Sequence, residues 1–412
     1  MGNWRSEIGI LWPMSEQLAI DGGPKVRELP YPPWPVLGEE DVEAVAEVLR
    51  SGKLTQLTGG AVTAFEEAFA AWHGTKHCVA TNNGTTAIHT ALAALDIGPG
   101  DEVIVPAHTF IASATPVLHQ RATPVFADID ERTYCISPES VAERITPRTK
   151  AIIAVHLNGH PAEMGALLAL VEPRGIAVIE DAAQAHGAGW REIGDQKSEI
   201  GWRKVGTIGR VGCFSFWEDK IMTTGGEGGA VITDDGALAE RMRRIRHHGE
   251  GPIAGERAYY HLELGYNYRM TSMQAATGLV QLRKLDSYIE ERQRNAAYLS
   301  ERLGEIDGVE APFVAQYAVH SYYKYIARLR PETEIDIARF VPAVAAEGVP
   351  ISRRYPTPLP QQPVFRGLAA GTCPIAERLA AELFTLLVHP TVETADLDDV
   401  VAAIRKVVRG LG

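Results

Sequence analysis

Short apolar runs alternate with helical stretches between residues 76 and 235, and this alternation constrains the fold more than any other feature. The apolar runs cover residues 77–81, 102–107, 124–129, 151–157, 176–181, 212–217 and 229–234. Strands that alternate with helices in this way are typical of an α/β domain with a largely parallel sheet. The run at 151–157 is apolar on both faces, as expected where helices cover both sides of a sheet. We therefore predict a mostly parallel, seven-stranded sheet sandwiched between helices.

The C-terminal third has a different pattern. Residues 273–303 combine helical periodicity with many charges, which predicts a long, exposed connecting helix. Further apolar runs and a helical stretch follow, and a last helix ends near Arg409. The proline-rich segment 353–365 is predicted to be a surface loop, because proline lacks the amide donor that regular structure needs. We predict three parts, which are an N-terminal arm (1–24), a large domain (25–289) and a smaller α+β domain (290–412).

One segment of the large domain has the pattern of an insertion. GWREIG at 189–194 is echoed by GWRKVG at 201–206, with a polar stretch between them. A local duplication that forms a longer hairpin is the plainer interpretation, and a functional lid is the alternative.

Composition and charge exclude several classes of protein. The 412 residues include 52 acidic and 40 basic ones, for a net charge of −12, which argues against nucleic acid or an anionic membrane as a partner. No apolar run approaches the ~18 residues that span a bilayer, and the N-terminus carries Glu7 and lacks the cleavage site of a signal peptide. None of the four cysteines forms a CxxC pair and the paired histidines lack ligand-spaced companions, so we expect neither disulfides nor a metal site. These features predict a cytoplasmic protein.

A lysine and a glycine cluster stand together in the stretch from Ser215 to Asp234. A lone lysine is usually a solvated surface charge. Lys220, however, follows an apolar run and precedes GGEGG, where glycines permit tight turns that side chains would block. Because Ser215 lies at the end of the preceding strand, its hydroxyl and the lysine amine can face one pocket.

Two polar residues follow the apolar strand in VIEDAAQAHGA. Asp181 ends the strand and Gln184 comes three residues later. The carboxyl ends of parallel strands are where α/β sheets bind ligands. A carboxylate there suits a partner for a cationic ring nitrogen, and a helix N-cap is the alternative role for Asp181.

A third element is the turn at Gly84 and Thr85, between the run at 77–81 and a predicted helix. Free amides and the positive end of the helix dipole make such a turn an anion site. The sequence there fits neither GxxxxGK[ST] nor GxGxxG, so we do not expect an ATP-type phosphate loop or a dinucleotide site. A lysine, an aspartate at a strand end and a glycine–threonine turn are together what pyridoxal phosphate (PLP) chemistry requires.

The sequence also resembles a known family, the DegT/DnrJ/StrS-type aminotransferases. Six ordered stretches between residues 30 and 290 carry the resemblance, and weaker similarity continues through SRRYPTPLPQQPVF and CPIAERLA. The first residues of the six stretches are, in order, NNGTTAIH, PVFADID, ITPRTKAI, VIEDAAQAHGA, VGCFSFWEDKIMTTGGEGG and LGYNYRMTSMQ. Members act on nucleotide-linked keto-sugars and on keto-cyclitols. The resemblance implies a fold-type I, aspartate-aminotransferase-like homodimer with PLP at the subunit interface.

The resemblance implies roles for individual residues. Lys220 would form an imine with the cofactor aldehyde and carry protons, and Asp181 would pair with the pyridinium nitrogen. Gln184 would approach the phenolic oxygen, and Phe110 would stack on the ring. The phosphate would be held by Gly84, Thr85 and Ser215, and from the neighbouring subunit by Asn267 and Arg269.

Some positions depart from the family pattern and leave the acceptor unidentified. Asn158 stands where relatives often carry tyrosine, and His108 where phenylalanine or leucine is common. Either could line the acceptor pocket or be neutral. The candidate contacts from the small domain are His320, Tyr323, Arg353 and Arg354, whose alternative is ordinary strand and loop surface.

We therefore expect a PLP-dependent aminotransferase that moves an amino group from glutamate or glutamine to a keto-sugar or keto-cyclitol in secondary-metabolite or polysaccharide biosynthesis. A PLP-dependent sugar dehydratase is an alternative within the family, but such enzymes replace the lysine with histidine. A non-catalytic regulator with the same fold is the other alternative, and the intact set of Lys220, Asp181 and Gln184 argues against it.

Overall fold

The computed structural model describes residues 17–193, 201–251, 259–368 and 371–412, and it contains the predicted seven-stranded sheet. Its strands, in the order β1-β9-β8-β5-β4-β2-β3, are β1 (His77–Thr81), β9 (Gly229–Thr233), β8 (Val211–Ser215), β5 (Ala177–Asp181), β4 (Thr149–Val155), β2 (Glu102–Pro106) and β3 (Thr123–Ala127). Every predicted strand is present, with ends that differ by at most two residues. β9 pairs antiparallel with β8 and β1, and the remaining pairs are parallel. The mostly parallel sheet is confirmed.

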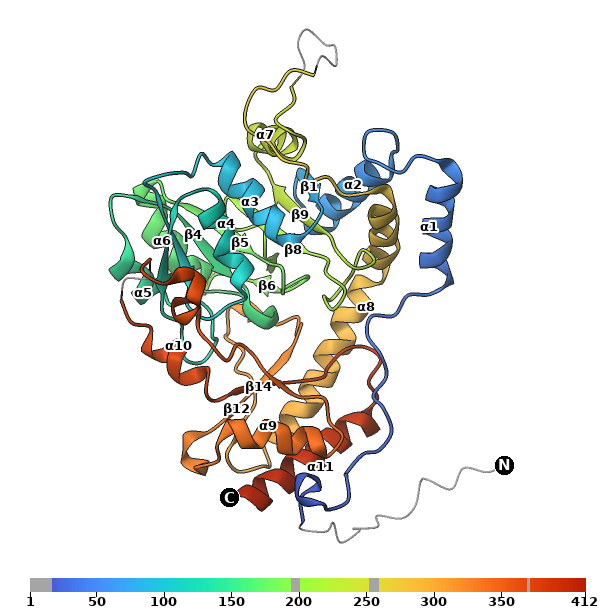
Figure 1. Ribbon diagram of the computed structural model, residues 1–412, viewed down its shortest axis with the longest axis vertical. Coiled ribbons are helices and arrows are strands. Elements are labelled where there is room, and N and C mark those ends of the chain that lie inside the picture. Colours follow the sequence, from blue (N-terminus) through green and yellow to red (C-terminus); the bar gives the residue numbers. More distant parts are fainter. Residues whose placement is uncertain (1–16, 194–200, 252–258, 369–370) are drawn as a thin grey trace.

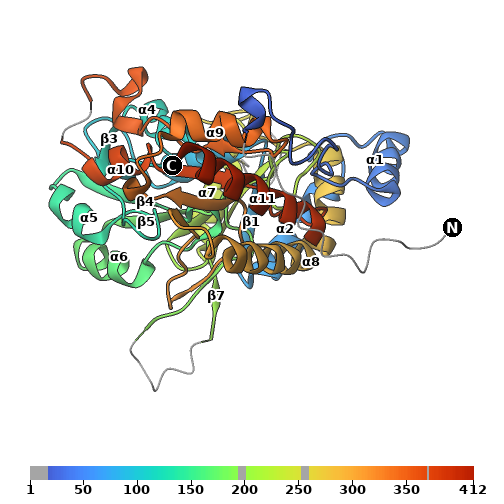
Figure 2. The same ribbon diagram turned by 90° about the horizontal axis from the view of Figure 1, so that it is seen from below.

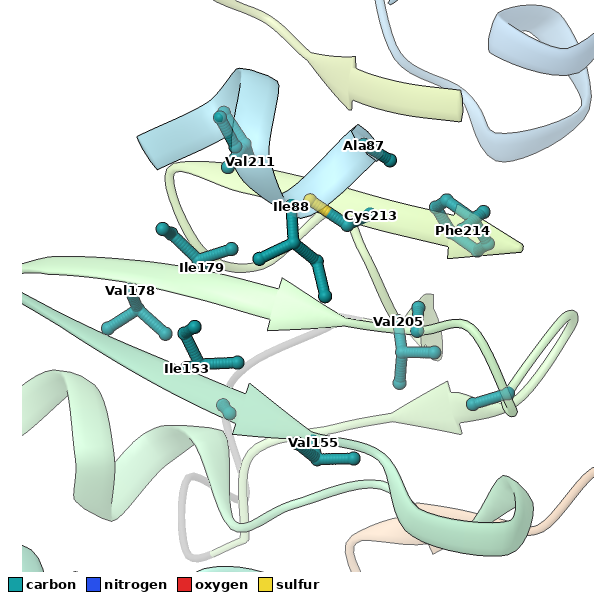
Figure 3. Close-up of a cluster of buried hydrophobic side chains, with 14 of the residues drawn as sticks. Ala87, Ile88, Ile153, Val155, Val178, Ile179, Val205, Val211, Cys213 and Phe214 are labelled. Atoms are coloured by element: carbon teal, nitrogen blue, oxygen red, sulfur yellow. The ribbon is translucent and has the colours of Figure 1, made fainter. Parts of the chain in front are cut away.

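Helices cover both faces of this sheet (Figures 1 and 2). They are α2 (Ala61–His73), α3 (Gly84–Ala94), α4 (Thr115–His119), α5 (Pro138–Arg144), α6 (Met164–Val171) and α7 (Gly236–Arg246). Strands β2, β8 and β9 are buried at every position, which explains their continuous apolar sequences. Figure 3 shows Ile88 of α3 among apolar side chains of the central strands, including Ile179 and Cys213. Burying an isoleucine in this way contributes roughly 1.5–3 kcal/mol.

The long helix α8 (Ser272–Leu303) continues from the large sheet to the C-terminal part of the chain (Figure 1). Thr271 caps its N-terminus and forms a capping box with Gln274. Its apolar residues Ala275, Leu282, Leu285 and Ile289 belong to the hydrophobic cluster of the large sheet, whereas Ala296, Leu299 and Leu303 belong to a second cluster. The division between the two clusters agrees with the predicted domain boundary at residue 290, which stays a prediction.

The second cluster lies around a four-stranded antiparallel sheet in the order β10-β12-β14-β13. Its strands are β10 (Val309–Glu310), β12 (Tyr325–Leu329), β14 (Leu383–Leu386) and β13 (Ser352–Arg353). The helices of this part are α9 (Ile337–Ala346), α10 (Pro374–Leu379) and α11 (Thr394–Leu411). Leu18, which falls in the predicted N-terminal arm, is buried in the same cluster. The first sixteen residues of that arm lie outside the described residues.

The proline-rich segment 353–365 is a loop with 3-10 turns, as predicted, but it is anchored to the large domain at a few buried residues. Leu359 and Phe365 are fully buried, and the Leu359 amide donates a hydrogen bond of 2.8 Å to the carbonyl of Ala107 beside β2. The prolines break regular structure, but apolar residues between them fasten the segment to the large sheet. This contact brings Arg354 and Tyr355 to the carboxyl edge of the sheet.

The predicted hairpin at 189–206 is present at its two described ends. β6 (Gly189–Trp190) pairs antiparallel with β7 (Arg203–Lys204), and β11 (Ala318–Val319) adds a third strand. Residues 194–200 lie outside the described residues, and a role for the hairpin stays a prediction.

The remaining elements are short or peripheral. Helix α1 (Glu39–Ser51) packs against α8, where Lys284 forms an ion pair with Asp41 at 2.9 Å. The 3-10 turns are Ala19–Asp21, Ile111–Ser113, Leu157–Gly159, Glu172–Arg174, Pro331–Thr333, Leu359–Gln361 and Pro363–Phe365. Within the described ranges, no helix combines the length and apolar character needed to cross a bilayer, and no cluster of three or more His, Cys, Asp or Glu side chains could hold a metal ion. All four cysteines are buried and free.

Candidate active site

A cavity of about 640 Å³ lies at the carboxyl ends of β5 and β8, between the large sheet and the segment that follows β13. Residues that are far apart in the sequence meet there. The predicted residues that line it are Gly84, Thr85, Phe110, Asp181, Gln184, Ser215, Lys220, Tyr323, Arg353 and Arg354. The structure thus brings together the lysine, the aspartate and the glycine–threonine turn.

Lys220 lies on the loop after β8, and its side chain is almost fully buried. Its Nζ atom is 4.6 Å from the centre of the Tyr323 ring. Burial, reinforced by the positive charge of Arg354, lowers the pKa of Lys220 to about 7. The indole Nε1 of Trp34 donates a hydrogen bond of 3.1 Å to the Lys220 carbonyl and so fixes the backbone of the loop. A large fraction of the amine is therefore uncharged near neutral pH and able to act as a nucleophile.

Asp181 ends β5, and both its carboxylate oxygens accept hydrogen bonds. Oδ2 accepts from the hydroxyl of Ser113 at 2.7 Å, and Oδ1 accepts from the amide of Ala183 at 3.1 Å. An ionised carboxylate can only accept, so the Ser113 hydroxyl must donate to it and is left to accept from Thr109 at 3.1 Å. Residues 182–188 form turns and no helix, so the alternative in which Asp181 is a helix N-cap is wrong.

The turn at Gly84 has the geometry of an anion site. Asn83 caps α3 and accepts a hydrogen bond of 2.9 Å from the amide of Thr86. The backbone hydrogen bonds within the described ranges give the amides of Gly84 and Thr85 no acceptor. A Cβ atom on Gly84 would lie 2.6 Å from Cβ of Ser215, so glycine is required for the helix start to approach that hydroxyl. The amides, the hydroxyl and the helix dipole together suit a phosphate.

Gln184 connects two walls of the cavity. Its Oε1 accepts from the amide of Asn158 at 3.0 Å, and its Nε2 donates to the hydroxyl of Tyr355 at 3.1 Å. Phe110 lies in the cavity wall with half of its surface exposed, and its ring centre is 6.2 Å from that of Tyr355. Tyr355 was not predicted as a site residue, because only the folding of the proline-rich segment brings it here.

Three of the predicted substrate contacts do not line the cavity. Asn158 is buried and meets Gln184 through its backbone amide. His108 is buried behind Tyr355, with ring centres 5.8 Å apart, and burial lowers its pKa to about 4. His320 is buried and stacks on Tyr322 at 3.9 Å. The predicted contacts of these three side chains with substrate stay predictions, and the buried positions of the side chains do not support them.

Asn267 and Arg269 also lie away from the cavity lining. Asn267 is exposed, whereas Arg269 forms a contact of 2.8 Å with His247 through its guanidinium. The alternating residues Tyr266 and Tyr268 stack on each other at 4.9 Å and are packed against buried His89. The aromatic side chains thus hold this segment, and Asn267 is exposed, as its predicted role in a neighbouring subunit requires. That role stays a prediction.

Further residues of the site were missed from the sequence. Ser113 and Trp217 line the cavity, as does Asp219, which forms an ion pair of 2.7 Å with Lys324. Ser113 lies in the AHTFIASA stretch that also holds the predicted residues His108 and Phe110, so the sequence already pointed to its neighbourhood. The contact of Trp34 with the lysine loop joins distant parts of the chain, and no local pattern indicates it.

Comparison with known proteins identifies the family. The model of the DegT/DnrJ/EryC1/StrS aminotransferase family matches residues 35–405. GDP-perosamine synthase of Caulobacter vibrioides is 39% identical over 353 residues, which cover 85% of this chain and 90% of that protein. L-glutamine:2-deoxy-scyllo-inosose aminotransferase of Micromonospora echinospora is 37% identical, with 95% of this chain and 97% of that protein covered.

Solved structures agree with these relatives. The aminotransferase from Psychrobacter cryohalolentis superposes with a TM-score of 0.83 at 36% identity, covering 91% of this chain and 98% of that one. The structure of NtdA from Bacillus subtilis, which contains the bound cofactor PMP, superposes with a TM-score of 0.81 at 28% identity, covering 93% and 86% of the two chains. The fold is therefore the fold-type I arrangement that the resemblance implied. The chain belongs to the DegT/DnrJ/EryC1/StrS aminotransferase family and is an aminotransferase.

Proposed function

We propose that this protein is a PLP-dependent aminotransferase that transfers an amino group from glutamate or glutamine to the keto group of a nucleotide-linked sugar or a cyclitol. The observation that carries the proposal is the buried amine of Lys220, which shares one cavity with Asp181 and the Gly84 turn. The acceptor class follows relatives named for a GDP-linked amino sugar and for a scyllo-inosose.

The cavity fits PLP. The free amides at Gly84 and Thr85 and the Ser215 hydroxyl would hold the phosphate, since the absent side chain of Gly84 leaves the approach open. Asp181 would pair with the ring nitrogen and Gln184 with the ring oxygen. When bound, PLP supplies an aldehyde that condenses with amines and a ring that withdraws electrons from the substrate carbon.

Lys220 would move the protons of the reaction. Proton transfer is most efficient when the pKa of the catalytic group is close to the working pH, and burial lowers the pKa of Lys220 to about 7. The loop is held by Trp34 at the Lys220 carbonyl and by the ion pair between Asp219 and Lys324. These contacts limit the space that the amine can explore.

Asp181 would remain an acceptor throughout. Ser113 donates to one of its oxygens and the amide of Ala183 to the other, so both hydrogen bonds hold the carboxylate in one orientation. An ionised Asp181 keeps a ring nitrogen beside it protonated. Ser113 and Thr109 are positioning residues in this arrangement, because they act through Asp181.

We also propose a homodimer in which Asn267 completes the phosphate site of the neighbouring subunit. A doubly charged phosphate in a partly dry cavity needs several donors, and in this chain Asn267 is exposed and away from its own cavity. Its exposure supports a role toward a second copy.

Turnover of a substrate panel tests the function. Purified protein is incubated with PLP, with glutamine or glutamate, and with keto-sugars and keto-cyclitols, and the amino products and cofactor absorbance are recorded. We expect an amino product in the wild type and none in Lys220→Ala, with the exposed Lys53→Ala as the matched control. A deoxygenated keto product without nitrogen would indicate a dehydratase, and cofactor binding without any product would favour the regulator.

A further inference from the structure

Trp217 and Glu227 lie opposite each other where the chain continues beyond strands β8 and β9. The two strands pair antiparallel, with Ser215 at the end of β8 opposite Gly229 at the start of β9. Two backbone hydrogen bonds join the segments beyond these ends. They run from the amide of Phe216 to the carbonyl of Gly228 at 2.7 Å and from the amide of Glu218 to the carbonyl of Gly226 at 3.0 Å. These bonds bracket Trp217 and Glu227, and both residues line the cavity that contains Lys220.

The backbone around Glu227 is fixed by contacts that leave its side chain unused. The Glu227 carbonyl accepts hydrogen bonds of 2.7 Å from the hydroxyl of Thr224 and from Nε2 of Gln274. A Cβ atom on Gly229 would lie 2.3 Å from the carbonyl oxygen of Asn83, so glycine lets this segment approach the start of α3. The Glu227 carboxylate, by contrast, has no hydrogen-bond or ion-pair partner in the part of the chain that the structure describes. The fold therefore holds an unpaired carboxylate at a defined place in the cavity wall.

The charges around the cavity indicate which ligand suits this carboxylate. Among the described residues that line the cavity, the two other carboxylates are engaged, Asp181 by hydrogen bonds and Asp219 by an ion pair. Burial and the negative charge of Glu218 raise the pKa of Glu227, so donors that a ligand brings would stabilise its ionised form. A cationic ligand is disfavoured, because two arginine side chains also line the cavity. Neutral hydroxyl groups supply donors without adding positive charge.

Trp217 adds an apolar surface beside the carboxylate. The residue is 39% exposed, so part of the indole is open to a ligand. An indole face gains dispersion energy from contact with C–H groups. An ionised carboxylate only accepts hydrogen bonds, and those it accepts from hydroxyl groups are strengthened by its charge. A ring with hydroxyl groups at its rim and C–H groups on its faces matches both side chains.

We infer that Trp217 and Glu227 bind the hydroxylated ring of the amino acceptor, an inference that rests on the proposed function and deepens it. The indole packs against the C–H face of the ring, and the carboxylate accepts hydrogen bonds from the hydroxyl groups. Glutamate and glutamine have no such ring, so the donor does not depend on this pair of side chains. Trp217 and Glu227 therefore determine which ketones the enzyme aminates.

The two half-reactions test this inference separately. For the donor half-reaction, the holoenzyme is mixed with L-glutamine or L-glutamate, and the loss of cofactor absorbance is followed. For the acceptor half-reaction, the aminated holoenzyme is mixed with 2-deoxy-scyllo-inosose or with UDP-N-acetyl-3-dehydro-α-D-glucosamine, and the recovery of absorbance is followed. Each experiment gives a second-order rate constant.

Variants of both residues should change the acceptor constant alone. In Glu227→Ala we expect the acceptor constant to fall about 100-fold and the donor constant to change less than about threefold. Glu227→Gln should lower the acceptor constant about tenfold, because the amide oxygen still accepts but carries no charge. Trp217→Ala should also lower it about tenfold, and Trp217→Phe, which keeps an aromatic face, should lower it less. Glu218→Gln removes a neighbouring exposed charge outside the cavity lining and is the matched control.

Other outcomes would overturn the inference. An equal fall of both constants in Glu227→Ala would show that the residue supports the lysine loop and does not bind the acceptor. A fall of the same size in Glu218→Gln would assign the effect to net charge near the cavity. A holoenzyme that reacts with glutamine but with neither ring ketone would refute the inference and leave the donor half of the proposed function in place. A holoenzyme that reacts with no amine would remove the proposed function as well. If Glu227→Ala fails to bind the cofactor, the two constants of Glu227→Gln decide.

Discussion

Replacing Lys220 with methionine should stabilise the protein in the absence of cofactor, and the gain should shrink as the pH rises. Burial lowers the pKa of Lys220 from 10.5 to about 7. Between these values the unfolded chain binds the proton and the folded chain releases it, so the free energy of unfolding of the wild type rises with pH. Since each pKa unit is worth about 1.4 kcal/mol, the buried amine costs about 4 kcal/mol at pH 7 and about 2 kcal/mol at pH 9.

Urea unfolding of both apoproteins at one protein concentration and several pH values measures this effect. The methionine side chain also changes apolar burial, but that contribution does not depend on pH. The diagnostic quantity is therefore the difference in unfolding free energy between Lys220→Met and wild type, which should fall by about 2 kcal/mol from pH 7 to pH 9. Lys53→Met, at an exposed position, should leave the pH profile of the wild type unaltered. A difference that stays constant over this range would refute the assignment of a low pKa to Lys220.

Three further predictions concern the cofactor site. Asp181→Asn should retain cofactor but lower kcat by ~10²–10⁴-fold, since a neutral ring cannot absorb the developing charge, and an unaltered kcat would contradict the role. Ser113→Ala removes a 2.7 Å hydrogen bond to that carboxylate and should lower kcat roughly 10- to 100-fold. Thr109→Val should lower kcat by less, and steady-state kinetics at saturating cofactor measures both values. A larger loss of kcat in Thr109→Val than in Ser113→Ala would contradict the arrangement. An equal mixture of Asn267→Asp and Lys220→Ala should recover about a quarter of wild-type activity if subunits exchange freely. Half of the dimers are then hybrids, and each hybrid carries both substitutions in one active site and leaves the other active site intact. Hybrids that mass spectrometry detects but that show no activity would place Asn267 in its own subunit's site.

The large sheet was predictable because its strands are buried on both faces. Such strands are continuous apolar runs bounded by polar turns, so their ends could be located within two residues. The proline-rich segment 353–365 was predicted only in part. Prolines indicated a loop correctly, but Leu359 and Phe365 needed the surface of the large sheet to bury them, and their partners are distant in the sequence.

The site residues also divide into those that a local sequence pattern locates and those whose position depends on distant parts of the chain. Asp181 and Lys220 follow strands directly, so the sheet carries them to its carboxyl edge and the sequence was sufficient to find them. His108 and Asn158 also follow strands, yet both are buried without lining the cavity. His108 packs against Tyr355, and the backbone of Asn158 is bonded to Gln184. These contacts decide on which side of the cavity wall each side chain lies, and a sequence pattern does not encode that choice.

The chemistry of Lys220 is likewise a property of the assembled chain. Its low pKa comes from burial and from Arg354, which a segment far along the sequence supplies. The N-terminal segment provides Trp34, which binds the Lys220 carbonyl, and the C-terminal part provides Lys324, which binds Asp219 on the same loop. A lysine in a glycine-rich stretch therefore identifies the position of the nucleophile, but its reactivity arises only when three separate parts of the chain close around it. A change at Trp34 or Lys324 can for this reason alter catalysis without touching any atom that reacts.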